Sequence, residues 1–162
     1  MSLTYEVRTE ELRPTLTAVV RGEMPAAQMS AWLPDAYAAV FDYLRRAGVP
    51  PAAPPFARLT FLGDTVAIEA GVPVLTEVAG DGRVQASSLP EGPAAITTHV
   101  GRYEDVEHAL DAVTRWLAGR GLQSAGPHWE VYYTDPTTEP DSDRWRTDVV
   151  VPYRVNPSAH VG

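Results

Sequence analysis

The sequence predicts an α+β fold made of two similar β-α-β-β units, each preceded by a further strand. Two amphipathic helical segments stand among short extended segments, and the order strand, turn, strand, helix, strand, strand occurs at residues 3–74 and again at 83–153. An offset of about 80 residues between the two copies indicates an internal duplication. Because one helix cannot cover both faces of its sheet, we expect the repeats to pair around a pseudo-two-fold axis and to leave a cleft for a ligand.

The first repeat contains an alternating strand from Val7, an apolar strand over residues 16–21 and then an amphipathic helix. The apolar stripe of this helix consists of Leu33, Tyr37, Val40, Phe41 and Leu44. Proline is tolerated in the first turn of a helix, so Pro34 predicts that the helix begins near residue 33. Gly48, followed by two prolines, predicts its end.

Two further strands complete the first repeat, over residues 57–62 and 65–73, and Gly63-Asp64 predicts a hairpin turn between them. Residues 74–82 are rich in glycine and acidic side chains, which favours a linker between the repeats.

The second repeat follows the same order. Its predicted strands cover residues 83–89, 94–100, 128–134 and 146–152, and its helix covers residues 104–118. A turn at 90–93 and a polar loop at 135–144 connect these elements. We therefore expect a single domain over residues 1–153 and a frayed tail over residues 154–162.

Composition limits the function. The net charge of -8 and the pI of about 4.9 argue against a surface that follows nucleic-acid phosphates, and they fit either solubility or attraction of cationic ligands. The chain has no cysteine, which excludes disulfides and thiolate metal sites. No secretory signal or apolar stretch of membrane-spanning length occurs, so we expect a cytoplasmic protein with no membrane partner.

The segment around Glu130 is the most informative part of the chain, because a carboxylate lies within an aromatic and β-branched strand. Burying an ionised carboxylate costs several kcal/mol unless a partner compensates. Strand alternation predicts that His128, Glu130 and Tyr132 face the cleft, while Trp129, Val131 and Tyr133 pack under a helix. The alternative interpretation is that Glu130 is solvated on an open sheet face.

Glu69, in the last strand of the first repeat, is a second candidate carboxylate, with a solvated edge position as its alternative. Tyrosines on helices, such as Tyr37, could form aromatic walls around a cation, although most such residues pack in cores. The four histidines have no metal-ligand spacing, and no phosphate-binding glycine loop or serine nucleophile motif is present. We therefore expect no metal and no cofactor.

The sequence resembles the GyrI-like small-molecule-binding domains, a fold also found as the effector-binding domain of BmrR-type and AraC-type transcription activators. The resemblance extends over nearly the whole chain in the expected order. It depends on the segments AGVPV at 70–74, HVGRYE at 99–104, WEVYYTDP at 129–136 and the ending from Trp145 to Pro152.

This resemblance implies SHS2-like units whose antiparallel sheets form a groove for hydrophobic, often cationic compounds. It implies that Glu130 corresponds to the central pocket carboxylate, with Tyr37, Tyr132 and Trp129 as candidates for the aromatic wall. In the activators a helix-turn-helix or winged helix precedes this domain. Nothing precedes Tyr5 here, so we expect no direct nucleic-acid binding.

The sequence leaves three functions open. The first is a stand-alone bacterial binding protein that holds a hydrophobic or cationic drug or metabolite against Glu130. The second is a hydrolase of reactive cyclopropane-bearing compounds that uses Glu130 as a general acid or base. The third is a modulator that binds DNA gyrase as a protein partner. The sequence does not decide between a monomer and a homodimer, or whether the protein is an enzyme.

Overall fold

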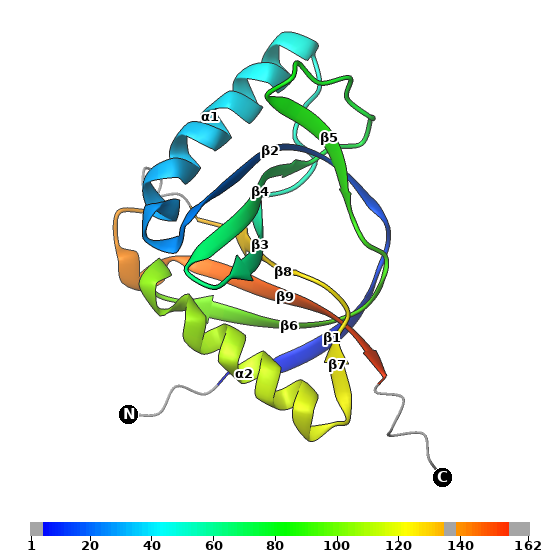
Figure 1. The fold of residues 1–162 in the computed structure, drawn as a ribbon, viewed down its shortest axis with the longest axis vertical. Helices are drawn as coiled ribbons and strands as arrows, with labels where there is room; N and C mark the ends of the chain where they lie inside the picture. The colour runs from blue at the N-terminus through cyan, green and yellow to red at the C-terminus, as the bar shows by residue number, and fades with distance from the viewer. Residues whose placement is uncertain (1–4, 135–138, 156–162) are drawn as a thin grey trace. The chain divides into compact units, whose positions relative to one another are not determined.

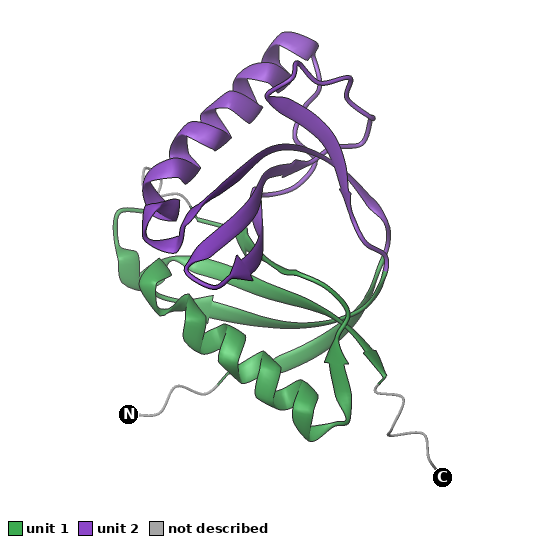
Figure 2. Ribbon diagram, viewed as in Figure 1, with its two compact units in different colours: residues 1–12, 92–162 green, residues 13–91 purple. Residues whose placement is uncertain are grey.

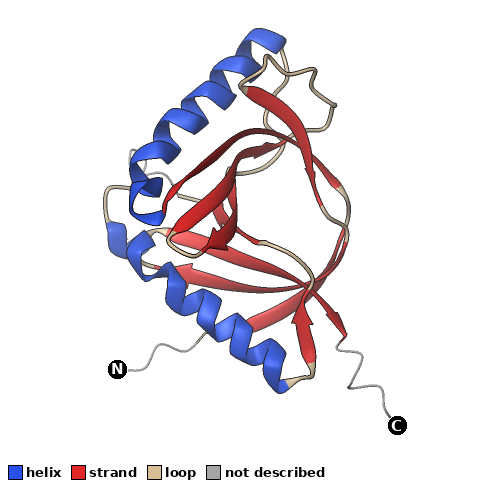
Figure 3. Cartoon of the chain, viewed as in Figure 1, coloured by secondary structure: helices blue, strands red, loops and turns tan. Residues whose placement is uncertain are grey.

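The structure is a computed structural model that describes residues 5–134 and 139–155. The chain divides into two compact units (Figure 2), of which unit 1 contains residues 1–12 and 92–162 and unit 2 contains residues 13–91. Each unit has a helix and antiparallel strands (Figure 3), which confirms the predicted α+β class.

Unit 2 contains a sheet with the strand order β3-β4-β2-β5, in which all neighbours are antiparallel. The chain passes from β2 through the 3₁₀ turn η1 into helix α1, which packs against β2, β4 and β5. The Gly63-Asp64 hairpin between β3 and β4 is confirmed, because Leu62 pairs directly with Thr65. The elements are β2 (Thr15–Pro25), η1 (Ala26–Gln28), α1 (Met29–Ala47), β3 (Phe56–Leu62), β4 (Thr65–Pro73) and β5 (Val84–Leu89).

Helix α1 begins at Met29, so the prediction of a start near residue 33 is wrong. Pro34 lies inside the helix, where its missing N–H leaves the carbonyl of Ser30 without the usual helical donor. Ser30 is exposed, so water can satisfy that carbonyl and the helix tolerates the proline. The helix ends as predicted at Gly48, which adopts φ +71° while the N–H of Val49 donates to the carbonyl of Leu44 at 3.0 Å.

Helix α1 covers the face of the sheet that contains Gly22 of β2. A Cβ at Gly22 would lie 2.5 Å from the ring of Trp32 on α1, so any larger residue at this position would force the tryptophan to shift. Ile68 pairs with Gly22 and therefore lies on the same face, whereas the next pair, Arg21 and Glu69, lies on the opposite face. The charged pair of this sheet is thus on the side that faces away from α1.

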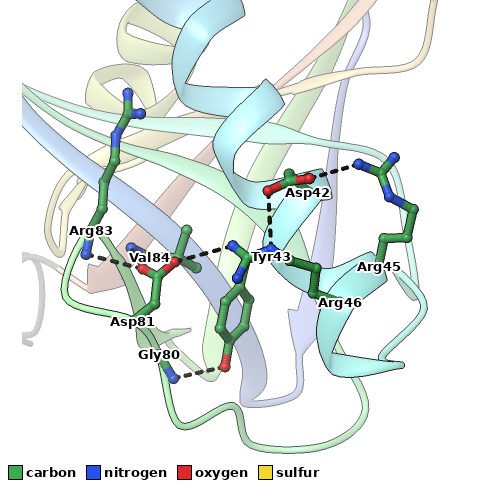
Figure 4. A network of polar contacts seen from close by, with 8 residues as sticks. All are labelled: Asp42, Tyr43, Arg45, Arg46, Gly80, Asp81, Arg83 and Val84. Atoms are coloured by element: carbon green, nitrogen blue, oxygen red, sulfur yellow. Dashed lines mark hydrogen bonds and ion pairs between the residues drawn. The ribbon is translucent and has the colours of Figure 1, made fainter.

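Residues 74–82 connect β4 to β5, the strands between which the linker was predicted, but both strands belong to unit 2, so the units do not divide at this segment. Tyr43 of α1 accepts a hydrogen bond from the N–H of Gly80 at 2.8 Å, and Arg46 lies 3.5 Å from the Asp81 carboxylate (Figure 4). Backbone N–H groups, first that of Val84, hold the pKa of Asp81 below its usual value. The segment is anchored to the end of the helix by these contacts.

Unit 1 contains a sheet with the strand order β1-β6-β9-β8, and β7 pairs with the far end of β9. Helix α2 runs beside β6 (Figure 1) and packs against β1, β6, β7 and β9. The elements are β1 (Val7–Leu12), β6 (Gly92–Val100), η2 (Tyr103–Asp105), α2 (Val106–Gly119), β7 (Leu122–Ser124), β8 (His128–Tyr132), η3 (Ser142–Arg144) and β9 (Arg146–Val155).

The core of unit 1 lies between α2 and one face of its sheet. Val113 and Leu117 of α2 pack against Ala95 of β6 and against Val149 and Val151 of β9, and all five are buried. Strand β7 was missed in the sequence because it is short. Strand β9 extends to Val155, past the predicted end at residue 152, so the prediction that the tail begins at residue 154 is wrong for its first two residues. The rest of the predicted tail, from residue 156 onward, lies outside the described residues.

The leading strands do not stay with the repeats in which they were predicted. β1 pairs with β6 of unit 1, and β5 pairs with β2 of unit 2, so each leading strand belongs to the unit formed by the other repeat. After this exchange the orders β1-β6-β9-β8 and β5-β2-β4-β3 correspond strand by strand. The unit boundaries therefore differ from the predicted ranges 3–74 and 83–153, while duplication as the origin of the symmetry stays a prediction.

Candidate functional site

Glu130 lies at the centre of β8 with its two predicted neighbours beside it. The hydroxyl of Tyr132 donates a hydrogen bond to Oε1 of Glu130 at 2.9 Å, and Nε2 of His128 lies 3.8 Å from Oε2. The side chain of Glu130 is 14% exposed and that of His128 is 9% exposed. Strand alternation therefore brings these three side chains together on one face, as predicted.

The face itself differs from the prediction. Glu130 pairs with Val149 of β9, and paired residues of antiparallel strands share a face. Val149 packs under α2, so Glu130 lies on the helix-bearing face of the sheet, and Trp129, paired with Val150, lies on the other. The expectation that Trp129, Val131 and Tyr133 form the helix-packed core is therefore wrong. These side chains lie on the face of β8 that points away from α2.

A row of aromatic rings continues from Tyr132. Tyr103 of η2 meets Tyr132 edge to face with ring centroids 5.5 Å apart, and it stacks on Trp145 at 4.5 Å. The Tyr103 hydroxyl donates to the carbonyl of Thr134 at 3.1 Å, and Nε1 of Trp145 donates to the carbonyl of Glu139 at 2.7 Å. These backbone contacts fix the orientation of the Tyr103 and Trp145 rings.

Neither Tyr103 nor Trp145 was among the predicted site residues. Both lie in segments that carried the family resemblance, at 99–104 and 145–152. The sequence could not show that these two residues are neighbours, because they lie far apart within the second repeat. Only the pairing of β6 and β8 with β9 brings them to the same end of the sheet.

His99 supports the segment that carries Tyr103. Its ring is buried and lies 3.0 Å from the carbonyl of Arg102, and its Nδ1 lies 2.9 Å from the Tyr5 hydroxyl. A carbonyl only accepts, so Nε2 carries a proton, and in the neutral imidazole Nδ1 then accepts from Tyr5. Burial raises the pKa of Tyr5 and the Asp105 carboxylate raises it further, which keeps this hydroxyl a donor.

Glu69 has different partners from those of Glu130. Its Oε2 lies 3.2 Å from Nε of Arg21, and its Oε1 accepts from Ser87 at 2.8 Å. It lies on β4, the strand that corresponds to β9, whereas the counterpart of β8 is β3. Glu69 is therefore not in a position equivalent to Glu130, and its charge is already neutralised by an arginine.

Tyr37, the last predicted wall residue, lies on α1 in unit 2 and donates its hydroxyl to the carbonyl of Phe56 at 2.8 Å. Trp129 is 4% exposed. Of the six predicted site residues, the structure thus groups His128, Glu130 and Tyr132 within unit 1.

Two further observations concern metal binding and membrane crossing. Among the described residues, no three histidine, aspartate or glutamate side chains come together as a metal-binding group. Over residues 5–134 and 139–155, no helical segment has the length and hydropathy that crossing a membrane requires. The groups gathered at the site are a carboxylate, an imidazole and a row of aromatic rings.

The sequence profile of the GyrI-like small molecule binding domain matches residues 5–154, nearly the whole chain and all of the site. The chain belongs to this family. The match confirms the resemblance that the sequence motifs indicated. A search of curated proteins finds no match to this sequence.

Solved structures share the fold of this GyrI-like chain. The EcmrR C-terminal domain superimposes with a TM-score of 0.82 at 17% identity, over 94% of this chain and 99% of that one. In a complex of EcmrR with DNA the TM-score is 0.81 at 17% identity, over 93% of this chain, which spans only 58% of that EcmrR chain.

Two further neighbours have lower scores. SAV2435 bound to tetraphenylphosphonium has a TM-score of 0.64 at 11% identity, with 98% of each chain covered. A hydrolase from Listeria innocua has a TM-score of 0.61 at 14% identity, with 92% of each chain covered. At these identities the likeness establishes the fold alone.

Proposed function

We propose that this GyrI-like domain binds a hydrophobic organic cation, with the positive charge against Glu130 and the apolar part against Tyr132, Tyr103 and Trp145. The proposal depends on the burial of the Glu130 carboxylate and on the side chains around it. Glu130 is mostly buried, and among the described residues no arginine nitrogen lies within 4.0 Å of it. The chain contains no lysine.

Electrostatics supports a cationic ligand. A partly desolvated carboxylate without a fixed cation loses hydration that a ligand cation can replace, and the local dielectric is lower than that of water. Aromatic faces attract cations by about 0.5–2 kcal/mol when the charge lies within about 6 Å of the ring. Glu130 and the three rings therefore favour the same class of ligand.

Charge preference tests this proposal directly. Tetraphenylphosphonium and tetraphenylborate have nearly the same shape and opposite charges, and SAV2435, which shares the fold, was solved with the first of them. We expect this protein to bind the phosphonium and to reject the borate. Isothermal titration calorimetry with both probes measures the difference, and equal affinities would contradict the proposal.

Substitution of Glu130 tests whether its charge is the cause of the preference for phosphonium over borate. Glu130→Gln keeps the shape and the hydrogen bond from Tyr132 while it removes the charge. We expect phosphonium affinity to fall by roughly tenfold to a hundredfold, about 1.4–2.8 kcal/mol. Glu69→Gln is the matched control, because its carboxylate already has an arginine partner, and it should leave phosphonium binding within about twofold.

The hydrogen bond between Tyr132 and Glu130 also favours a second candidate, a hydrolase. A carboxylate that touches both a phenol and an imidazole could take a proton from a water that opens a strained cyclopropane ring. The test is turnover of an electrophilic cyclopropane compound followed by mass spectrometry. Addition of water that disappears in Glu130→Gln would favour the hydrolase, and recovery of intact compound after hours would favour the binding protein.

A further inference from the structure

We propose that His128 sets the charge preference of the Glu130 site, an inference that rests on the proposed function. When its imidazole is neutral, the carboxylate is available to a cationic ligand. When its imidazole is protonated, it neutralises Glu130 from within the protein and repels that ligand.

The geometry supports this competition. Nε2 of His128 lies 3.8 Å from Oε2 of Glu130, while Tyr132 occupies the other oxygen, Oε1, at 2.9 Å. The His128 side chain is 9% exposed, so its charge is poorly screened by water. The imidazole and an incoming cation would therefore compete for the same carboxylate oxygen.

The groups that the described residues of unit 1 present on this face include a second imidazole, that of His99 on β6, because His99 pairs with Thr147 and Thr147 pairs with Tyr132. From its own strand, Glu130 and Tyr132 face His128, and Tyr103 approaches Tyr132 from η2. From the neighbouring strand β9, the same face presents Val149 and Val151 together with Thr147. The side chains that α2 buries on this face are all apolar, namely Val106, Ala109, Val113 and Leu117.

Imidazole is the side chain that ordinarily changes charge between about pH 5 and pH 8. Protonation of His128 would add a positive charge beside a cation bound at Glu130, and we expect phosphonium affinity to fall by about tenfold from about pH 8 to about pH 5.5. Tetraphenylphosphonium has no proton to lose, so the protein alone accounts for any change. Tetraphenylborate should bind no more weakly at the lower pH.

Variants separate the histidines. His128→Gln should lose most of the pH dependence of phosphonium binding, because glutamine stays neutral throughout. His108→Gln is the matched control, since His108 is exposed on α2, and it should keep the full dependence. Retention of the dependence in His128→Gln would overturn the inference. Normal loss of phosphonium binding in Glu130→Gln would then still leave the proposed function intact.

A measurement on the unsubstituted protein avoids any effect of the variants on folding. Binding and protonation are linked, so a cation that competes with His128 must shift the imidazole titration to lower pH. NMR of histidine-labelled protein with and without tetraphenylphosphonium measures this shift. We expect the His128 signals to titrate at lower pH in the complex and those of His108 to stay unchanged. Coincident His128 curves would refute the competition.

Discussion

The two faces of the sheet in unit 1 each contain a buried or mostly buried carboxylate, and the two carboxylates have different partners. On the face away from α2, Asp148 is 3% exposed and its oxygens accept from Thr98 at 2.7 Å and from Arg8 at 3.0 Å. On the helix-bearing face, Glu130 has a tyrosine hydroxyl and an imidazole but no arginine among the described residues. The first carboxylate is fixed by the fold and the second is available.

Unit 2 repeats the first arrangement. Glu69 on β4 combines with Arg21 from the adjacent strand and Ser87 from the strand beyond it. In unit 1 the order is reversed, because the hydroxyl of Thr98 comes from the adjacent strand and Arg8 from the strand beyond. In both units, an arginine and a hydroxyl thus bind a carboxylate on the helix-free face of the sheet. Glu130 lies outside this pattern, which is why it is the better candidate for function.

The comparison predicts the largest effect on stability at Asp148. Asp148→Asn removes a buried charge that two strands hold, and we expect the free energy of unfolding to fall by about 1–3 kcal/mol. Urea unfolding followed by tryptophan fluorescence measures the change. Glu10→Gln is the control, because Glu10 is the exposed second partner of Arg8 at 3.7 Å, and it should change stability by less than about 0.5 kcal/mol. Equal losses in both variants would argue against a special role for the buried carboxylate.

Glu69→Gln should have an intermediate effect. Arg21 is 48% exposed, so water screens this pair more than the one at Asp148. We expect a loss of about 0.5–1 kcal/mol in the same urea experiment. Ser87→Ala removes the second partner of Glu69 and should produce a comparable loss. If Glu69→Gln cost as much as Asp148→Asn, the difference in burial would not be the deciding factor.

Glu130→Gln should hardly change stability. The glutamine side chain can still accept from Tyr132, and no arginine loses its partner. We expect a change within about 0.5 kcal/mol of the unsubstituted protein, in either direction. Glu130→Gln should therefore lose phosphonium binding without losing stability, whereas Asp148→Asn should lose stability. A loss as large as that of Asp148→Asn would place Glu130 among the structural carboxylates.

The smallest expected effect concerns Tyr133, near the Asp148 network. Burial raises the pKa of the Tyr133 phenol, and the Asp148 charge raises it further. A raised folded-state pKa means stability that is present below the unfolded pKa of 10.0 and lost as pH rises through the folded value. Asp148→Asn should lower the pH at which Tyr133 ionises, measured by ultraviolet titration against Tyr133→Phe. An unchanged titration would show that Asp148 does not act on Tyr133.

Much of the fold was predictable because local signals decide it. The apolar stripes located both helices, and Gly63-Asp64 and Gly48 located a hairpin and a helix end. Partner choice between strands was not predictable. Nothing in residues 7–12 says that they pair with β6 and not within their own repeat, since an alternating strand can pair with many edges.

The site was predictable in part for the same reason. Alternation alone grouped His128, Glu130 and Tyr132. It could not tell which face α2 covers, and it kept Glu69 as a second candidate because that residue also lies in an apolar strand. The arginine partner of Glu69 comes from a neighbouring strand, so only the strand register separates a carboxylate that an arginine neutralises from one that has no arginine within reach among the described residues.

The position of β1 has a consequence for how the chain can be divided. Unit 2 is one continuous stretch of sequence inserted into unit 1. The edge strand β1 of unit 1 precedes this insertion in the sequence, and the rest of unit 1 follows it. A fragment that begins at residue 92 would leave one edge of β6 without its neighbour and would lack both Tyr5 and Arg8. Truncation from the amino terminus therefore damages the half of the molecule that is encoded last.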